Sequence, residues 1–163
     1  MKYICSDCGK EHERWPALAF KSPYHYSILS EEDKKNIADI GSDLCIIKRK
    51  SQIDRFIRTV MIQKVYDSCQ DLEYGIWVSL SEKSFDDYLE NIDSETHTPS
   101  YFGWFCNGLP EYENTFLIKT TVEVQFGTQY RPIIRLNENN DFRNPFVMDY
   151  FEGISEKEVL QRI

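Results

Sequence analysis

The N-terminal segment Cys5-Ser6-Asp7-Cys8-Gly9 has the residue pattern with the most specific chemistry in this chain. Two thiolates separated by two residues, on a tight turn that the glycine eases, can occupy two corners of a tetrahedral zinc site. A closed structural site needs four ligands, and the sequence has no second Cys-x-x-Cys pair. His12, Cys45 and Cys106 are the candidates for the other corners. The sequence thus offers a candidate zinc site at Cys5, Cys8, His12 and Cys45.

Two other interpretations of the cysteine pair stay open. One is a pair of reduced thiols that binds no metal. The other is a thioredoxin-like redox pair, but such a pair opens a helix after a strand, and no helical pattern follows Cys8. An odd total of five cysteines suits reduced thiols or metal ligands better than a disulfide framework.

Cys45 has a simpler interpretation as a small core residue. As a nucleophile it would need a positioned base, and no local motif links it to any of the three histidines. The sequence also lacks a paired-carboxylate spacing, a glycine-rich phosphate loop and a serine elbow. No catalytic residue is therefore predicted.

Composition and charge exclude several classes of protein. The chain has 163 residues, a net charge of −8 and 14% aromatic residues. An acidic chain is a poor general nucleic-acid binder, and so many aromatic residues argue against disorder. Residues 48–64 are the exception, with six basic residues and one acidic residue. They form either a solvated basic segment or a docking patch for an acidic partner or RNA.

The N-terminus has no basic-then-apolar signal region, and no apolar run approaches the roughly 20 residues that span a bilayer. We therefore expect a cytoplasmic protein that does not insert into a membrane.

The elements that must position these residues are mostly strands in the middle of the chain. Alternating or two-sided apolar patterns predict strands at 43–47, 53–65, 74–80, 101–106, 116–126 and 131–136. Ser30, Ser81 and Ser155 are predicted to cap helices, the first of which would end near Gly41. The links are short, which favours an α+β fold with an antiparallel or mixed sheet of about five to seven strands. We expect a single domain over 1–163, with a knuckle and irregular arm at 1–28 and an α+β body at 29–163.

Aromatic residues gather around Trp77 and residues 101–112, with Asn107 and Arg131 nearby in sequence. An aromatic floor with a few hydrogen-bond donors is typical of a ligand pocket or a protein interface. Aromatic residues on alternating strands are also ordinary core residues, so both interpretations remain.

Several blocks together resemble the bacterial domain-of-unknown-function family 2199. The blocks are Cys5-x-x-Cys8-Gly9-x-x-His12, Leu29-Ser30-Glu31-Glu32, Ser42-Asp43-Leu44-Cys45, Phe56-x-Arg58, Gly75-x-Trp77-Val78-Ser79-Leu80-Ser81-Glu82, Tyr101-Phe102-Gly103-Trp104, Asn107-x-Leu109-Pro110-x-Tyr112, Arg131-Pro132-x-Ile134-x-Leu136 and Gly153-Ile154. The resemblance implies a small, single-domain bacterial cytosolic protein and no particular activity. The family pattern expects a His-Pro pair near the C-terminus, where this chain has Asn144-Pro145.

The resemblance also sharpens the candidate binding surface, because some residues in these blocks have chemistry that packing alone does not require. The candidate ligand-binding residues are Arg58, Trp77, Ser79, Trp104, Asn107, Tyr112 and Arg131, with Asp43 beside them. The favoured hypothesis is a non-catalytic module that binds a protein partner, for example an immunity or antitoxin-like protein that covers a basic toxin. The alternatives are a small-ligand-binding protein or enzyme with an aromatic and arginine pocket, or a zinc-stabilised regulatory domain.

Overall fold

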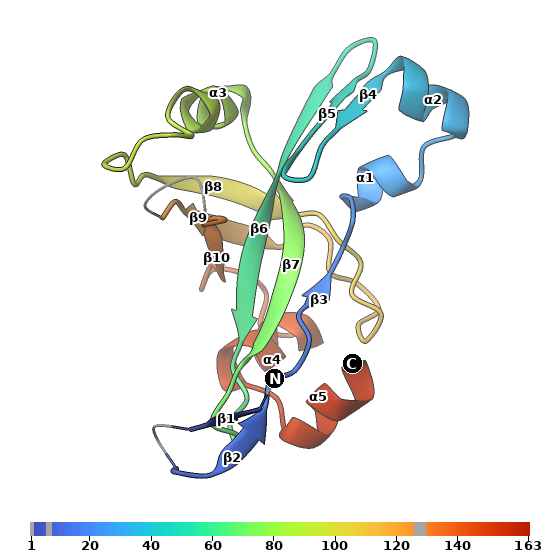
Figure 1. Cartoon of the computed structure of the whole chain (residues 1–163). Coiled ribbons are helices and arrows are strands. Elements are labelled where there is room, and N and C mark those ends of the chain that lie inside the picture. Colours follow the sequence, from blue (N-terminus) through green and yellow to red (C-terminus); the bar gives the residue numbers. More distant parts are fainter. Residues whose placement is uncertain (1, 6–7, 126–129) are drawn as a thin grey trace.

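The computed structural model describes residues 2–5, 8–125 and 130–163 (Figure 1). Its main sheet has eight strands in the order β3-β7-β8-β9-β10-β6-β5-β4. The strands are β3 (Leu18–Ala19), β4 (Ala38–Ile40), β5 (Leu44–Lys48), β6 (Ile53–Gln63), β7 (Leu72–Ser79), β8 (Ser100–Phe105), β9 (Lys119–Glu123) and β10 (Ile133–Leu136). The α+β class is confirmed, and the short strands β3 and β4 bring the sheet to eight strands. Phe126, the expected end of a strand, lies outside the described residues.

The sheet closes on itself through β6. Along one edge β6 pairs antiparallel with β7, and along the other it pairs antiparallel with β5 and then parallel with β10. Strands β6 to β10 therefore form a five-stranded barrel, and β5 and β4 extend beyond it as a hairpin. This position explains why β6 is apolar on both faces near Phe56, where the strand is covered on both sides, whereas Val60 and Ile62 on its outer face stay partly exposed.

Two hydrophobic clusters lie on the two faces of β6. Ile57 and Met61 belong to the larger cluster, to which all five barrel strands contribute buried residues. Phe56 belongs to a smaller cluster on the opposite face, which contains Cys45, Ile47, Trp77 and Cys106.

The described part of the chain contains five helices, of which α2 lies beside β4 (Figure 1). They are α1 (Tyr24–Ser27), α2 (Glu31–Asn36), α3 (Glu82–Glu90), α4 (Pro145–Glu152) and α5 (Glu156–Arg162). The predicted serine caps of α2, α3 and α5 are confirmed, including the reciprocal capping box at α5. Helix α2 ends at Asn36 rather than near Gly41, because β4 follows at once and pairs with β5.

Helix α4 was not predicted from the sequence. Asn144 is its N-cap: the side-chain Oδ1 accepts a hydrogen bond from Phe146 N–H (2.9 Å), and Pro145 occupies the first helical position. The Asn144 amide also donates to the Asn114 carbonyl (3.1 Å). Asn144, which stands where the resemblance led us to expect histidine, therefore has a local structural role, which is to begin a helix.

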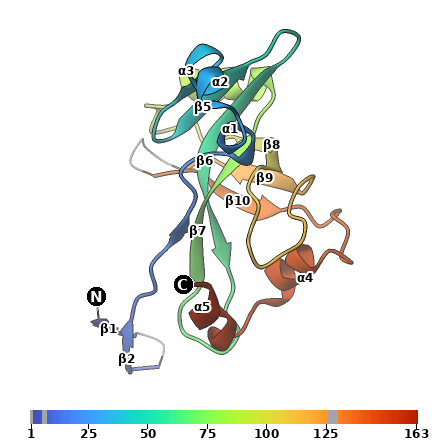
Figure 2. The same cartoon turned by 90° about the vertical axis from the view of Figure 1, so that its right-hand side faces the viewer.

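The N-terminal strands stand apart from the main sheet. β1 (Lys2–Ile4) and β2 (Glu11–Glu13) form their own antiparallel pair, and two views place it beside the lower end of the β6–β7 hairpin (Figures 1 and 2). The link between β6 and β7, residues 64–71, is therefore the part of the barrel that the N-terminal hairpin meets. None of the helices in the described part of the chain has the length and apolar character needed to cross a membrane.

Candidate metal centre

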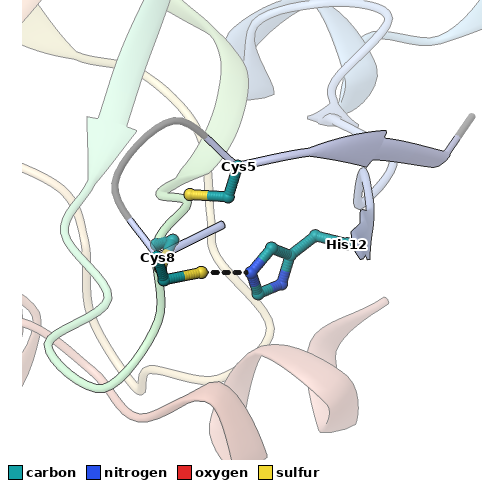
Figure 3. Close-up of side chains that lie close together, drawn as sticks. Cys5, Cys8 and His12 are labelled. Carbon is teal, nitrogen blue, oxygen red and sulfur yellow. Dashed lines mark hydrogen bonds between the residues drawn. The ribbon is translucent and has the colours of Figure 1, made fainter. Parts of the chain in front are cut away.

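Four metal-ligating side chains meet where the N-terminal hairpin contacts the β6–β7 link. The thiols of Cys5, Cys8 and Cys69 and the imidazole of His12 place their ligand atoms within 4.8 Å of one another. The Cys8 thiol lies 3.0 Å from Nε2 of His12 (Figure 3). A tetrahedral ion bound at about 2.3 Å would hold its sulfur ligands about 3.8 Å apart, so a small contraction of this group would complete such a site.

Local structure explains how three of the four side chains, those of Cys5, Cys8 and His12, come close together. The β1–β2 register sets Tyr3 opposite His12, which returns the histidine toward the cysteine turn. Cys5 closes the turn from both sides: its N–H donates to the Lys10 carbonyl, and its carbonyl accepts from Gly9 N–H, both at 2.9 Å. Gly9 has a φ of +68°, a conformation that glycine adopts without a Cβ clash. The spacing in the sequence thus already requires a knuckle here.

Cys69 comes from the β6–β7 link, and its neighbour Gln70 fastens that link to the hairpin. The Gln70 amide donates to the Glu13 carbonyl (3.0 Å), and its Oε1 accepts from the Tyr3 hydroxyl (3.5 Å). Hydrogen bonds to the Cys8 and Cys5 thiols raise the pKa of the Cys69 thiol well above its ordinary value. The Cys69 thiol therefore resists ionisation, and a bound cation would remove that resistance.

Cys45 does not join this group, which corrects the candidate set. It is fully buried in the smaller hydrophobic cluster between Ile47 and Phe56, and burial raises the pKa of its thiol to about 12. A thiol that stays protonated in an apolar environment is neither a metal ligand nor a nucleophile. Cys106, the other cysteine considered, is buried in the same cluster.

The sequence reasoning missed Cys69 because no ligand motif surrounds it. One signal was present: it is a lone cysteine in a polar turn between two long predicted strands, and hairpin turns are exposed. What the sequence did not show is that this turn reaches the N-terminus.

The candidate ligand-binding residues do not converge on one cavity. Trp77 and Asn107 are buried and bond to each other, with the Trp77 N–H donating to Oδ1 of Asn107 (2.7 Å). Tyr112 donates its hydroxyl hydrogen to Asp149 (2.7 Å) and accepts from Arg162 (2.9 Å), which holds α5 against the body. These three residues therefore support the fold.

Four candidates remain near the surface, in two places. Trp104 lies opposite Ser79 in the β7–β8 pair, and this tryptophan is 38% exposed beside Phe102.

The two arginines make polar contacts at the second place. Arg58 donates to the Ser42 carbonyl (3.4 Å), while Arg131 forms an ion pair with Asp43 (2.6 Å). Burial raises the pKa of Asp43, but hydrogen bonds from Arg131 and Ser42 outweigh it and lower the pKa overall. Of the seven candidates, only Arg131 lines the pocket of about 570 Å³ that lies beside α3.

Comparison with models of protein families gives a match over most of the chain. A family model described as "Uncharacterized protein conserved in bacteria (DUF2199)" matches residues 4–154. No curated protein and no solved structure matches the chain. The match includes Cys5, Cys8, His12 and Cys69 and ends before α5.

Proposed function

The chain belongs to the DUF2199 family of uncharacterised bacterial proteins, and from that premise we propose that it is a zinc-stabilised binding protein without catalytic function. The observation that carries the proposal is the set of four ligand atoms, all within 4.8 Å of one another. Three thiols and one imidazole form a donor set that zinc prefers. Four protein ligands also leave no open position for water or substrate, which is typical of a structural rather than a catalytic zinc site.

The zinc would join two parts of the chain that few other contacts connect. Cys5, Cys8 and His12 lie on the N-terminal hairpin, whereas Cys69 lies on the barrel. Apart from the cysteines, the hydrogen bonds between the hairpin and the link are those of Gln70 to Tyr3 and Glu13, within the described residues. We therefore assign the zinc the role of fastening the hairpin to the β6–β7 link.

Metal analysis of the purified protein tests this proposal. We expect about one zinc per chain in the native protein and almost none in Cys69→Ala. Cys45→Ala is the matched control, because it also removes a cysteine but should keep the metal. Equal zinc content in both variants, or zinc lost only from Cys45→Ala, would contradict the ligand set. Iron in place of zinc, detected by the same analysis and by visible absorption, would keep the site but change its metal.

A second function, binding of a protein partner, is supported by the distribution of charge. Residues 82–95, which form α3 and the loop after it, carry six acidic residues and one lysine. That is a net charge of −5 in a chain whose total is −8. A surface of this kind attracts a basic protein and speeds its association. Immunity to a basic toxin is one concrete form of such a function.

Affinity capture from the source cell tests partner binding. We expect a basic protein to be retained at about 50 mM salt and released at about 500 mM, because salt screens exposed charges. The double variant Glu90→Lys/Asp93→Lys should lose the same protein, whereas Glu138→Lys/Glu152→Lys, which changes the charge equally elsewhere, should retain it. Retention by all three proteins, or by none, would contradict binding at this surface.

A further inference from the structure

A pocket of about 570 Å³ lies beside the acidic α3 segment, outside the barrel. Its floor includes Val60 and Ile62 of β6 and Ile133 of β10. Val60 pairs with Ile133, so these side chains point to the same face of the sheet, opposite to the buried Met61 and Ile134. Ile62 remains 39% exposed although it is apolar. The pocket therefore has an apolar floor that stays partly exposed among the described residues.

The wall of the pocket combines aromatic and polar side chains from α3, the following loop and the start of β8. Tyr88 and Tyr101 contribute rings. His97 lies at the rim, where its Nε2 is 2.8 Å from Oδ2 of Asp87, which also accepts a hydrogen bond from the Tyr101 hydroxyl (2.5 Å). These bonds fix the loop against α3, so the wall is built before any ligand arrives.

Charge in the pocket is unbalanced. Arg131 and Asp43 neutralise each other in an ion pair. The carboxylates of Glu73 and Asp93 also line the pocket, and across the described ranges 2–5, 8–125 and 130–163 neither carboxylate makes a hydrogen bond or an ion pair. Two carboxylates therefore line the pocket without an ion-pair partner among these residues.

We infer that this pocket receives a lysine or arginine side chain of a protein partner. Such a side chain has an apolar stem that can lie on Val60, Ile62 and Ile133, and a cationic head that can reach Glu73 or Asp93. The net charge of −5 on residues 82–95 beside the pocket would attract further basic residues of the partner. An acidic or purely apolar occupant would leave these carboxylates unpaired.

The inference rests on the proposed binding of a basic partner and specifies where one side chain enters. It does not depend on the zinc site, which lies at the N-terminal hairpin. An experiment can therefore contradict the pocket inference and leave the zinc proposal standing, or the reverse.

Titration of the full-length, isotope-labelled protein with capped pentapeptides tests the pocket. The probes are Ala-Ala-X-Ala-Ala peptides in which X is lysine, arginine, norleucine or glutamate. We expect the lysine and arginine peptides to produce saturable amide shifts at Val60, Ile62, Glu73 and Ile133. The norleucine and glutamate peptides should produce none, because they lack the cation. Equal shifts with norleucine would overturn the charge requirement, and shifts confined to other residues would overturn the location.

Variants separate a specific pocket from general attraction. Glu73→Gln/Asp93→Asn should weaken binding of the lysine peptide about tenfold or more. Glu138→Gln/Glu152→Gln is the matched control, since it removes the same charge from exposed residues that do not line the pocket. Equal weakening in both variants would overturn the pocket and leave only long-range attraction. If the captured partner bound normally to Glu73→Gln/Asp93→Asn, the pocket inference would fail while the partner-binding function stood.

Discussion

Asn107 joins two segments of the chain inside the protein. Its Oδ1 accepts from Trp77 N–H (2.7 Å), and its Nδ2 donates to the Ser22 carbonyl (3.0 Å). Only 2% of the residue is exposed, so water cannot replace either partner. A buried polar group that loses its partner costs about 1–3 kcal/mol.

We therefore predict that Asn107→Ala lowers the free energy of unfolding by about 2–4 kcal/mol, since two backbone groups lose their partners. Urea unfolding measures the change. Asn139→Ala, at an exposed position, is the control and should change it by less than about 0.5 kcal/mol. A similar small change in Asn107→Ala would contradict the structural role of this amide.

His25 is the residue whose titration should change stability near neutral pH. Its ring stacks on Phe56 (5.4 Å between centroids), and its Nδ1 is buried and has no hydrogen-bond partner in the part of the chain that the structure describes. Burial lowers the pKa of His25 below its ordinary value of 6.5. The unfolded chain then binds a proton more readily than the folded chain, so stability is lost as the pH falls below that value.

We predict that His25→Phe removes this part of the pH dependence. The free energy of unfolding of the variant, relative to that of the native protein, should rise as the pH falls from about 7 to about 5, and stay constant above about pH 7. Because both proteins keep His12 and the cysteines, their common pH dependence cancels in the difference. A difference that stays flat over the whole range would mean that His25 titrates normally.

At the scale of elements, the β6–β7 link holds both ends of the chain. Cys69 and Gln70 contact the N-terminal hairpin. On the other side, the Asp67 carboxylate accepts from Glu156 N–H (2.7 Å) at the start of α5, and Tyr66 N–H donates to the Ile154 carbonyl (3.1 Å). The link is thus a connector between the candidate metal centre and the C-terminal helix.

Asp67→Ala should loosen α5. The Glu156 N–H loses its acceptor, which we expect to cost about 1 kcal/mol and to speed hydrogen exchange in the first turn of the helix. Ser68→Ala, at the next position, is the control, since its side chain makes no hydrogen bond in the described residues. Unchanged exchange in α5 of Asp67→Ala would show that the capping box and Arg162 hold the helix by themselves.

At the scale of the whole molecule, a bound metal should be needed to hold the N-terminal hairpin in place but not to keep the barrel folded. The larger core cluster contains no residue of β1 or β2. The barrel closes through backbone pairing that does not involve the hairpin. Removing a metal ion from the candidate centre should therefore release the hairpin and leave the barrel folded.

Limited proteolysis with and without a chelator checks this expectation. We predict that chelation exposes new cleavage sites before β3, within residues 2–17, while the rest of the chain resists and still unfolds cooperatively. Restoring zinc should restore protection. Loss of the cooperative transition on chelation would instead show that the whole fold depends on the metal, as in zinc fingers.

The helix caps and most of the strands could be predicted because their signals are local. Ser30, Ser81 and Ser155 each bond a backbone N–H within the next turn, so their spacing suffices. The two-sided apolar pattern of β6 likewise predicted a covered strand. Barrel closure could not be predicted, because the parallel pairing of β6 with β10 joins segments far apart in the chain.

The sequence by itself determined the α+β class and three members of the candidate metal centre, Cys5, Cys8 and His12, because one turn and one short hairpin bring them together. The tertiary structure decided the fourth member, since Cys69 reaches the others only when the long β6–β7 hairpin lies beside the N-terminus. It also assigned Cys45, Trp77 and Asn107 to the interior. Residue type and spacing determine which side chains meet within one turn. Burial and contacts between distant segments depend instead on how the barrel closes.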